Sequence, residues 1–249
     1  MKEINSKDNE KIKHVVKLVN SKKYRENHKK FVVEGFKAIY DAYSFGLKAD
    51  NVFIHSSKVP EFDFVENSKL IIVNENILKK ISTTDSFSKS VAVFNTVDYN
   101  INDLKNKKTI ALFENIKDPG NLGTILRSAN AFGVEGIILY GDTIDIYNPK
   151  VIRSSVGNFL KIPIVKINDL PTLKEIFSEH KFYATKVDTN VGLETIKFKD
   201  KKIIMFGSEA TGLSNELSTA ADEFFTIKMK NKVESLNLSV AASIVFYSL

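Results

Sequence analysis

The second half of the chain alternates short apolar runs of strand length with amphipathic stretches of helix length, and this alternation restricts its fold more than any other feature. Helical patterns separate successive apolar runs. Such alternation is typical of a mostly parallel sheet that is covered by helices on both faces, so the sequence predicts the α/β class. In chain order the expected strands are TIALFE, GIILY, PIVKI, FYATK, KKIIMFG and FFTIKM.

The first part of the chain predicts a smaller α/β unit of its own. Apolar residues recur at helical spacing from about Lys7 to Ser21, and a basic loop, SKKYRENHKK, is expected to follow. The polar stretch DYNINDLKNKK, residues 98–108, has almost no core residues and is expected to be a linker. We therefore expect one domain over 1–97 and a second over 109–249. In the first domain the expected strands are FVVEG, NVFIH, LIIVN and VAVFNTV, and the expected helices include FKAIYDAYSFG and ENILKKIS.

Composition argues against several kinds of site and location. The chain has no cysteine, which excludes disulfides, thiolate nucleophiles and cysteine-bound zinc or iron–sulfur clusters. Its four histidines are scattered, so no metal site is expected. No run approaches the roughly 18 apolar residues of a membrane span, and the polar start MKEINSKDNEKIKH does not resemble a signal peptide. A cytoplasmic location without a membrane partner is therefore expected.

The formal net charge of +6 is confined to the N-terminus. Residues 1–30 contain ten Lys or Arg and four Asp or Glu, whereas residues 31–249 contain 26 of each. A localised positive patch favours a polyanionic partner, most simply nucleic acid. A solvated, partly frayed helix would give the same pattern, so charge alone leaves both interpretations open.

Three loops that follow strands of the second half are polar or rich in glycine between apolar flanks. Since ligands of α/β proteins bind at the carboxyl ends of strands, these loops are candidate sites. In residues 114–133, Asn121 is expected to cap a helix. Arg127 lies among the apolar positions of that helix, and it needs either an acidic partner in the core or a bound phosphate or carboxylate.

The other two loops are less specific by themselves. In residues 203–217, two glycines five positions apart allow close approach to a ligand, or they simply form a tight turn between strand and helix. This segment has neither a Walker loop nor a dinucleotide-binding fingerprint, which disfavours a nicotinamide-dependent oxidoreductase. In residues 233–249, Ser235 or Asn237 is expected to cap the last helix. A cap accounts for one of the three polar residues Ser235, Asn237 and Ser239 and does not explain the other two.

Taken together, these segments resemble a known family of enzymes. DPGNLGTILRSANAFG, FGSEATGLS and ESLNLSVAAS are similar, in this order, to motifs one, two and three of the SpoU (TrmH-like) branch of the SPOUT RNA methyltransferases. NPKVIRSSVGNFLKIPI resembles a segment that the family has between the first two motifs. KKYRENHKKFVVEGFKAI resembles the signature of the family's N-terminal substrate-binding domain, which is related to a ribosomal-protein fold. The resemblance covers nearly the whole chain.

The resemblance implies an enzyme that transfers a methyl group from S-adenosylmethionine to RNA, usually to a ribose 2′-hydroxyl. Ribosomal RNA is favoured as the substrate, and transfer RNA is the second choice. The resemblance also implies a homodimer and a deep trefoil knot in the C-terminal parallel-sheet domain, although general topology rules disfavour knots. Two alternatives stay open, a SPOUT enzyme that methylates a base and a non-catalytic RNA-binding protein that retains the fold.

The motif match also assigns the site residues. Because arginine is a poor base at neutral pH, we expect the first-motif arginine to hold the target phosphate and to steer the hydroxyl. The matched catalytic positions are Arg127, Asn121, Glu209, Ser235 and Asn237, and the matched cofactor positions are Gly207, Ile227 and Leu236. The basic residues that fall inside the N-terminal signature, and that are expected to bind RNA, are Lys22, Lys23, Arg25, Lys29 and Lys30.

The chain departs from the family pattern at two places. Lys228 and Asn231 stand where the family often has proline and glycine. Asparagine tolerates left-handed backbone better than most residues, so the cofactor loop is expected to persist. Ser88-Lys89-Ser90 replaces a Pro-Gln-Gly turn before a strand of the first domain, which affects details of that domain and not the chemistry.

Overall fold

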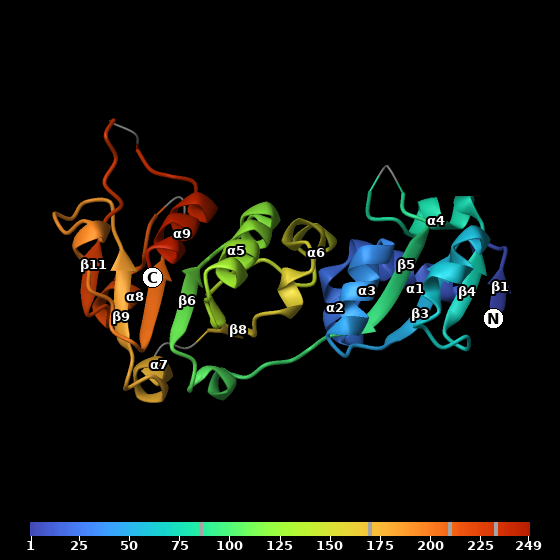
Figure 1. Cartoon of the computed structure of the whole chain (residues 1–249), viewed down its shortest axis with the longest axis horizontal. Helices are drawn as coiled ribbons and strands as arrows, with labels where there is room; N and C mark the ends of the chain where they lie inside the picture. Colours follow the sequence, from blue (N-terminus) through green and yellow to red (C-terminus); the bar gives the residue numbers. More distant parts are fainter. Residues whose placement is uncertain (85–86, 169–170, 209–210, 232–233) are drawn as a thin grey trace. The chain divides into compact units, whose positions relative to one another are not determined.

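The computed structural model describes residues 1–84, 87–168, 171–208, 211–231 and 234–249. The chain divides into two compact units, and each contains a sheet and helices as the sequence predicts (Figure 1). The N-terminal unit consists of Met1–Val97 and Asp145–Leu160, and the C-terminal unit consists of Asp98–Ile144 and Lys161–Leu249.

The N-terminal unit is built on a mixed sheet of five strands, β1 (Lys2–Ile4), β2 (Lys30–Glu34), β3 (Ala49–Ile54), β4 (Leu70–Val73) and β5 (Ser90–Asn95). Their order in the sheet is β1-β4-β3-β5-β2. The strands β1, β4 and β3 run parallel to one another, and β5 is antiparallel to both of its neighbours, β3 and β2. The helices of this unit are α1 (Glu10–Asn20), α2 (Lys22–His28), α3 (Phe36–Ser44), α4 (Glu75–Ile81) and α6 (Pro149–Ser155), with 3-10 turns η1 (Ser56–Phe62) and η3 (Asn158–Leu160). Apolar residues of α1, α4 and the sheet form a buried core.

Two elements of this unit differ from the sequence prediction. The basic stretch predicted as a loop forms α2, because the Ser21 side chain caps it by accepting the Tyr24 amide at 3.2 Å. The helix ends at Lys29, whose φ of 49° is left-handed. β1 is the second difference, since its three residues are too few to give a periodic pattern.

Asp145–Leu160 packs with the N-terminal unit, although the sequence predicts a continuous domain over 109–249. The Tyr147 hydroxyl donates to the Val97 carbonyl and accepts from its amide, both at 2.7 Å. Its ring stacks on Phe31 of β2 with centroids 4.6 Å apart. These contacts between residues far apart in sequence explain why the local pattern did not reveal the excursion.

Arg25 holds the same segment from the other side. Its Nε donates to Asp145 Oδ2 at 2.7 Å, and its Nη1 donates to the carbonyls of Leu18 and Val19 at 2.6 and 3.1 Å. The Arg25 side chain is 5% exposed and that of Asp145 is 9% exposed. Arg25 is therefore a buried structural residue, which corrects the RNA-binding role expected for it.

The C-terminal unit contains a six-stranded sheet in which every strand pair is parallel. This confirms the parallel sheet predicted from the alternation of strands and helices. The sheet has the order β11-β9-β10-β6-β7-β8 and is formed by β6 (Thr109–Glu114), β7 (Gly136–Tyr140), β8 (Ile164–Ile167), β9 (Lys181–Thr185), β10 (Lys202–Phe206) and β11 (Glu223–Phe225). Its helices are α5 (Pro119–Ala131), α7 (Pro171–Ile176), α8 (Asn215–Ala220) and α9 (Leu238–Tyr247), with 3-10 turns η2 (Ile101–Leu104) and η4 (Leu193–Thr195).

Helices cover both faces of this sheet because alternate residues of β6 and β10 point to opposite sides. On one face, Leu112 and Met205 are buried with Phe177, which follows α7, and with Leu217 of α8. On the other face, Phe206 contacts Phe246 of α9 with ring centroids 5.9 Å apart, and α9 packs against α5. None of the helices formed by the described residues is long and apolar enough to span a membrane.

The buried Arg25–Asp145 pair gives a prediction about stability. Arg25→Ala leaves the Asp145 carboxylate buried without its cation, which we expect to lower the free energy of unfolding by about 3–5 kcal/mol. Urea denaturation followed by circular dichroism measures the change. Lys23→Ala, an exposed neighbour on α2, is the control and is expected to stay within about 0.5 kcal/mol of wild type. Equal, small effects of both variants would contradict the structural role of Arg25.

Candidate functional site

The sheet of the C-terminal unit reverses its strand order between β6 and β10, which pair side by side. From β6 the chain continues to β7 and β8 on one side, whereas β10, β9 and β11 lie on the other. The loops that follow β6 and β10 therefore leave the same edge from neighbouring strands. Such a point of strand reversal is where open parallel sheets bind ligands.

Glu114, the last residue of β6, joins these two loops. It is 4% exposed, and its carboxylate accepts the Ser214 amide at 2.8 Å. Ser214 in turn caps α8 by accepting the Leu217 amide at 3.3 Å. The sequence analysis gave Glu114 no role. The signal that could have revealed it is an acidic residue at the end of an otherwise apolar strand.

The loop that begins at Gly207 is closed on itself. The Ser208 and Gly212 backbones exchange two hydrogen bonds of 3.0 Å, and the hydroxyls of Ser208 and Thr211 lie 2.7 Å apart. A Cβ at Gly207 would lie 2.1 Å from the Gly212 carbonyl carbon and 2.2 Å from the Leu213 nitrogen. Only glycine fits there without a shift of the backbone.

A cavity of about 550 Å³ lies beside this loop. It is lined by the ends of β9, β10 and β11 and by the residues that lead into α9. Gly207, Ile227 and Leu236, the three positions matched to cofactor contacts, all line it, and so does Ser235. Phe206 adds an apolar wall. The cavity therefore combines backbone groups of a tight loop with apolar surface, an arrangement that suits a small organic ligand.

The first and third motifs meet at a side-chain hydrogen bond. Asn237 Nδ2 donates to Asn121 Oδ1 at 3.0 Å. Asn237 also caps α9, because its Oδ1 accepts the amides of Ser239 and Val240 at 2.9 and 3.4 Å. The predicted cap of the last helix is thus Asn237. The cap of α5 is Asp118, which accepts the Asn121 amide at 2.7 Å, so the capping role expected for Asn121 is wrong.

Arg127 lies on α5 with an exposed side chain. It makes no hydrogen bond or ion pair with any residue that the structure describes. The sequence leaves two kinds of partner open for Arg127, an acidic residue in the core or a bound phosphate or carboxylate. In the described part of the chain, no acidic residue pairs with it. Among the described residues, nothing competes with an anionic ligand for its guanidinium. Neither Arg127 nor Asn121 lines the cavity, and Glu209 lies outside the described residues.

The expected RNA-binding residues differ in their exposure. Lys22, Lys23 and Lys29 are exposed, whereas Arg25 is buried. Lys30 Nζ donates to a carboxylate oxygen of Asp50 and, at 3.1 Å, to Asn95 Oδ1. Burial, together with the positive charge of Lys69, lowers the pKa of Lys30.

The departures from the family pattern have limited consequences for the cavity. Lys228 forms an ion pair with Glu194, and the hydrogen bond from Lys228 lowers the pKa of that carboxyl. Lys228 therefore has a protein partner in place of the phosphate contact that it could have offered. Among the described residues, no group of three or more His, Asp or Glu side chains could hold a metal ion.

Family models match both parts of the chain. A model described as the SpoU rRNA Methylase family matches residues 107–247, and one described as the MRM3-like substrate binding domain matches residues 9–92. The 23S rRNA (guanosine(2553)-2′-O)-methyltransferase RlmP of Bacillus subtilis is 28% identical over 251 residues, which cover 100% of this chain and 99% of that protein. The 23S rRNA (uridine(2479)-2′-O)-methyltransferase of Streptomyces viridochromogenes is 31% identical over 144 residues, 55% of this chain and 50% of that protein.

Solved structures resemble the whole chain. The AdoMet-bound rRNA methyltransferase from Sinorhizobium meliloti has a TM-score of 0.89 and 28% identity, and the match covers 99% of this chain and 96% of that chain. The SpoU methyltransferase AviRb from Streptomyces viridochromogenes has a TM-score of 0.87 at 24% identity, with 96% of each chain covered, and this likeness shows the fold alone.

The two roles of Asn237 can be separated by substitution. Asn237→Ala removes both the helix cap and the bond to Asn121, and we expect it to lower the free energy of unfolding by about 1–2 kcal/mol. Asn237→Asp keeps an acceptor for the α9 amides but has no donor for Asn121, so it is expected to recover most of that loss. Thermal unfolding measures both variants, with Asn74→Ala, which removes the cap of α4, for scale. Failure of the aspartate to restore stability would contradict the capping role.

Proposed function

The chain belongs to the SpoU rRNA methylase family, and we propose that it transfers a methyl group from S-adenosylmethionine to a ribose 2′-hydroxyl of 23S ribosomal RNA. The observation that carries the proposal is the cavity beside the Gly207 loop, at the ends of β9, β10 and β11, where all three motif-matched cofactor positions meet. The full-length relative from Bacillus subtilis, named as a 23S rRNA 2′-O-methyltransferase, supports the choice of RNA and of the ribose.

The residues around the cavity fit this cofactor. The Gly207 loop packs backbone against backbone with no room for a Cβ, and its residues Gly207, Ser208 and Gly212 line the cavity, where they would face the polar parts of a nucleoside. The side chains of Ile227 and Leu236 supply apolar walls. When bound, S-adenosylmethionine supplies a methyl group that is already activated on a sulfonium. The protein is left with two tasks, to align the acceptor hydroxyl and to remove its proton.

Arg127 is proposed to hold the phosphate next to the target ribose and to steer the 2′-hydroxyl. Its exposure and lack of a partner among the described residues support this role. An arginine guanidinium keeps its proton at neutral pH and is a poor base, so the proton is proposed to leave with the help of the bound phosphate. The hydrogen-bonded pair Asn121 and Asn237, with Ser235 at the cavity wall, would fix the surrounding polar groups. Glu209 is proposed to orient Arg127 or those groups.

Exposed apolar residues support a further part of the proposal, a homodimer. Val240, Ile244 and Tyr247 of α9 are 46%, 39% and 79% exposed, and Phe132 at the end of α5 is 42% exposed and contacts Tyr247. A second copy of the chain would remove this surface from water. A deep trefoil knot, which rests on the family resemblance, and a cytoplasmic location, which rests on the sequence expectation, complete the proposal.

The test is methyl transfer by the purified protein. With S-adenosylmethionine and 23S rRNA, we expect a 2′-O-methylated nucleoside that nuclease digestion and mass spectrometry identify. Arg127→Lys loses two-point binding of a phosphate, so turnover is expected to fall roughly tenfold to a hundredfold while calorimetry finds unchanged affinity for the cofactor.

Other outcomes would overturn parts of this proposal. A methylated base would make the chain a base methyltransferase, and absence of cofactor binding would make it a non-catalytic RNA-binding protein. Wild-type turnover by Arg127→Lys would remove the two-point role of the arginine and leave the activity standing. Comparison of 2′-O-methyl sites in RNA from cells with and without the gene identifies the nucleotide.

Exposed lysines of α2 are proposed to bind RNA phosphates. Lys22→Ala with Lys23→Ala is expected to weaken RNA binding and to reduce the slope of log affinity against log salt by roughly one to two, because each phosphate contact releases counterions. Filter binding over a range of salt concentrations measures the slope. Lys197→Ala with Lys199→Ala in the C-terminal unit removes the same charge and is expected to leave it unchanged. Equal effects of both pairs would contradict a localised RNA-binding surface.

A further inference from the structure

Three rings from α1 and α2 form a cluster on the N-terminal unit. His14 Nδ1 and the Tyr24 hydroxyl lie 2.9 Å apart, and their rings meet edge to face at 5.5 Å. His28 stacks on Tyr24 with ring centroids 3.9 Å apart and planes inclined by 27°, and it meets His14 edge to face at 5.4 Å. We refer to His14, Tyr24 and His28 as the ring cluster.

The ring cluster is more than a packing contact between the two helices. The His14–Tyr24 contact joins α1 and α2, and both side chains are half-buried. His28 is exposed, yet a hydrogen bond between its Nδ1 and the Tyr24 carbonyl at 2.9 Å keeps its ring flat on the tyrosine. An imidazole ordered in this way presents a flat surface to solvent.

The charged groups that face the ring cluster are cationic. Lys17 Nζ lies 5.5 Å from the centre of the Tyr24 ring. Burial lowers the pKa of His14, and the positive charges of His28, Lys30 and Lys17 add to the effect. The carboxylates that these two helices carry are paired with lysines, Glu10 with Lys13 at 3.0 Å and Glu26 with Lys22 at 3.9 Å.

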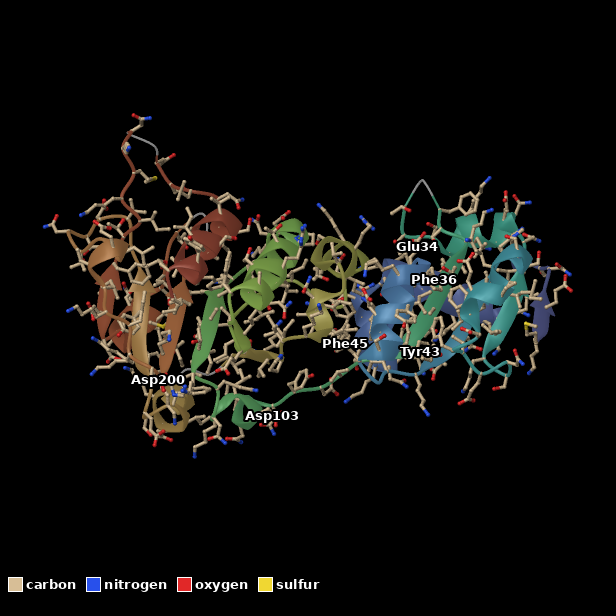
Figure 2. All side chains as sticks on the ribbon, viewed as in Figure 1. Glu34, Phe36, Tyr43, Phe45, Asp103 and Asp200 are labelled. Carbon is tan, nitrogen blue, oxygen red and sulfur yellow. The ribbon has the colours of Figure 1, made fainter. Side chains whose placement is uncertain are left out.

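The aromatic residues of α3 make an instructive contrast. Phe36 and Tyr40 are 38% and 49% exposed and stack at 6.0 Å (Figure 2 labels Phe36). On the next turn Asp41 carries a carboxylate, and Lys37 already pairs with it at 3.1 Å. This face thus offers rings without excess positive charge, whereas the ring cluster has Lys17 beside it, for which the described residues provide no carboxylate partner.

We propose that the ring cluster is a stacking platform for an unpaired RNA base, with Lys17 and the exposed lysines of α2 on the flanking phosphates. The inference rests on the proposed function insofar as the ligand is RNA. Bases splayed from single-stranded RNA stack on tyrosine and histidine rings, and positive charge beside the rings holds the backbone. The platform adds affinity for bases to a surface that lysines alone would make specific for phosphate.

Two probes of equal charge separate these contributions. A short single-stranded oligoadenylate offers bases and phosphates, and an abasic oligonucleotide of the same length offers phosphates alone. We expect wild type to bind the oligoadenylate more tightly, and His28→Ala to lose about fivefold or more of that affinity with no change for the abasic probe. His28→Phe keeps a ring and is expected to retain the preference. Lys17→Ala is expected to weaken both probes equally.

The control is Tyr40→Ala, which removes an exposed ring of similar size from α3 and is expected to change neither affinity. Circular dichroism of each variant tests whether the fold is kept. We expect it to be kept in the His28 variants, because this side chain is exposed. Equal affinity of wild type and His28→Ala for the oligoadenylate overturns the platform. Methyl transfer and cofactor binding are measured separately on the same variants, so a failure of the platform is distinguished from a failure of the proposed function.

Discussion

The pairing of β6 with β10 is the constraint on which the candidate site depends. Because both strands are parallel and adjacent, the loops after Glu114 and Phe206 emerge at one edge, although nearly a hundred residues separate them in sequence. The buried Glu114 carboxylate then fixes the second loop through the Ser214 amide. A loop held at its far end in this way can keep the tight turn at Gly207, where backbone packs against backbone, and the cavity beside it has a defined wall.

The motif residues of α5 and α9 serve folding and the site together. Asn237 satisfies the free amides at the start of α9 and, with its other side-chain group, binds Asn121 of the helix beside it. A residue that only capped the helix could be serine or aspartate. Asn237 does both, because its oxygen accepts the α9 amides while its nitrogen donates to the Asn121 oxygen.

The sequence predicts the elements well where the pattern is local and fails where a distant residue decides the outcome. Periodicity gave all six strands of the parallel sheet, and the motif match placed Gly207, Ile227 and Leu236 at one cavity. Arg25 shows the limit, since its charge looks the same in the sequence as that of Lys23, and only Asp145, 120 positions away, makes it a buried residue. Glu114 was missed in the same way, because its partner Ser214 lies 100 positions along the chain, whereas β1 was missed because three residues are too few for a periodic pattern.

The burial of Arg25 changes how the positive N-terminus is interpreted. A net charge concentrated in 30 residues is not one surface, because Arg25 neutralises Asp145 and Lys30 pairs with Asp50. These two cations have partners within the unit, whereas Lys17 of α1 lies 5.5 Å from the centre of the Tyr24 ring. We therefore expect affinity for a polyanion to depend on the positions of the lysines that have no carboxylate partner and on the rings of the ring cluster. Net charge alone cannot distinguish that arrangement from a solvated helix, whereas the contacts of Arg25 and Lys30 show which N-terminal cations already have partners.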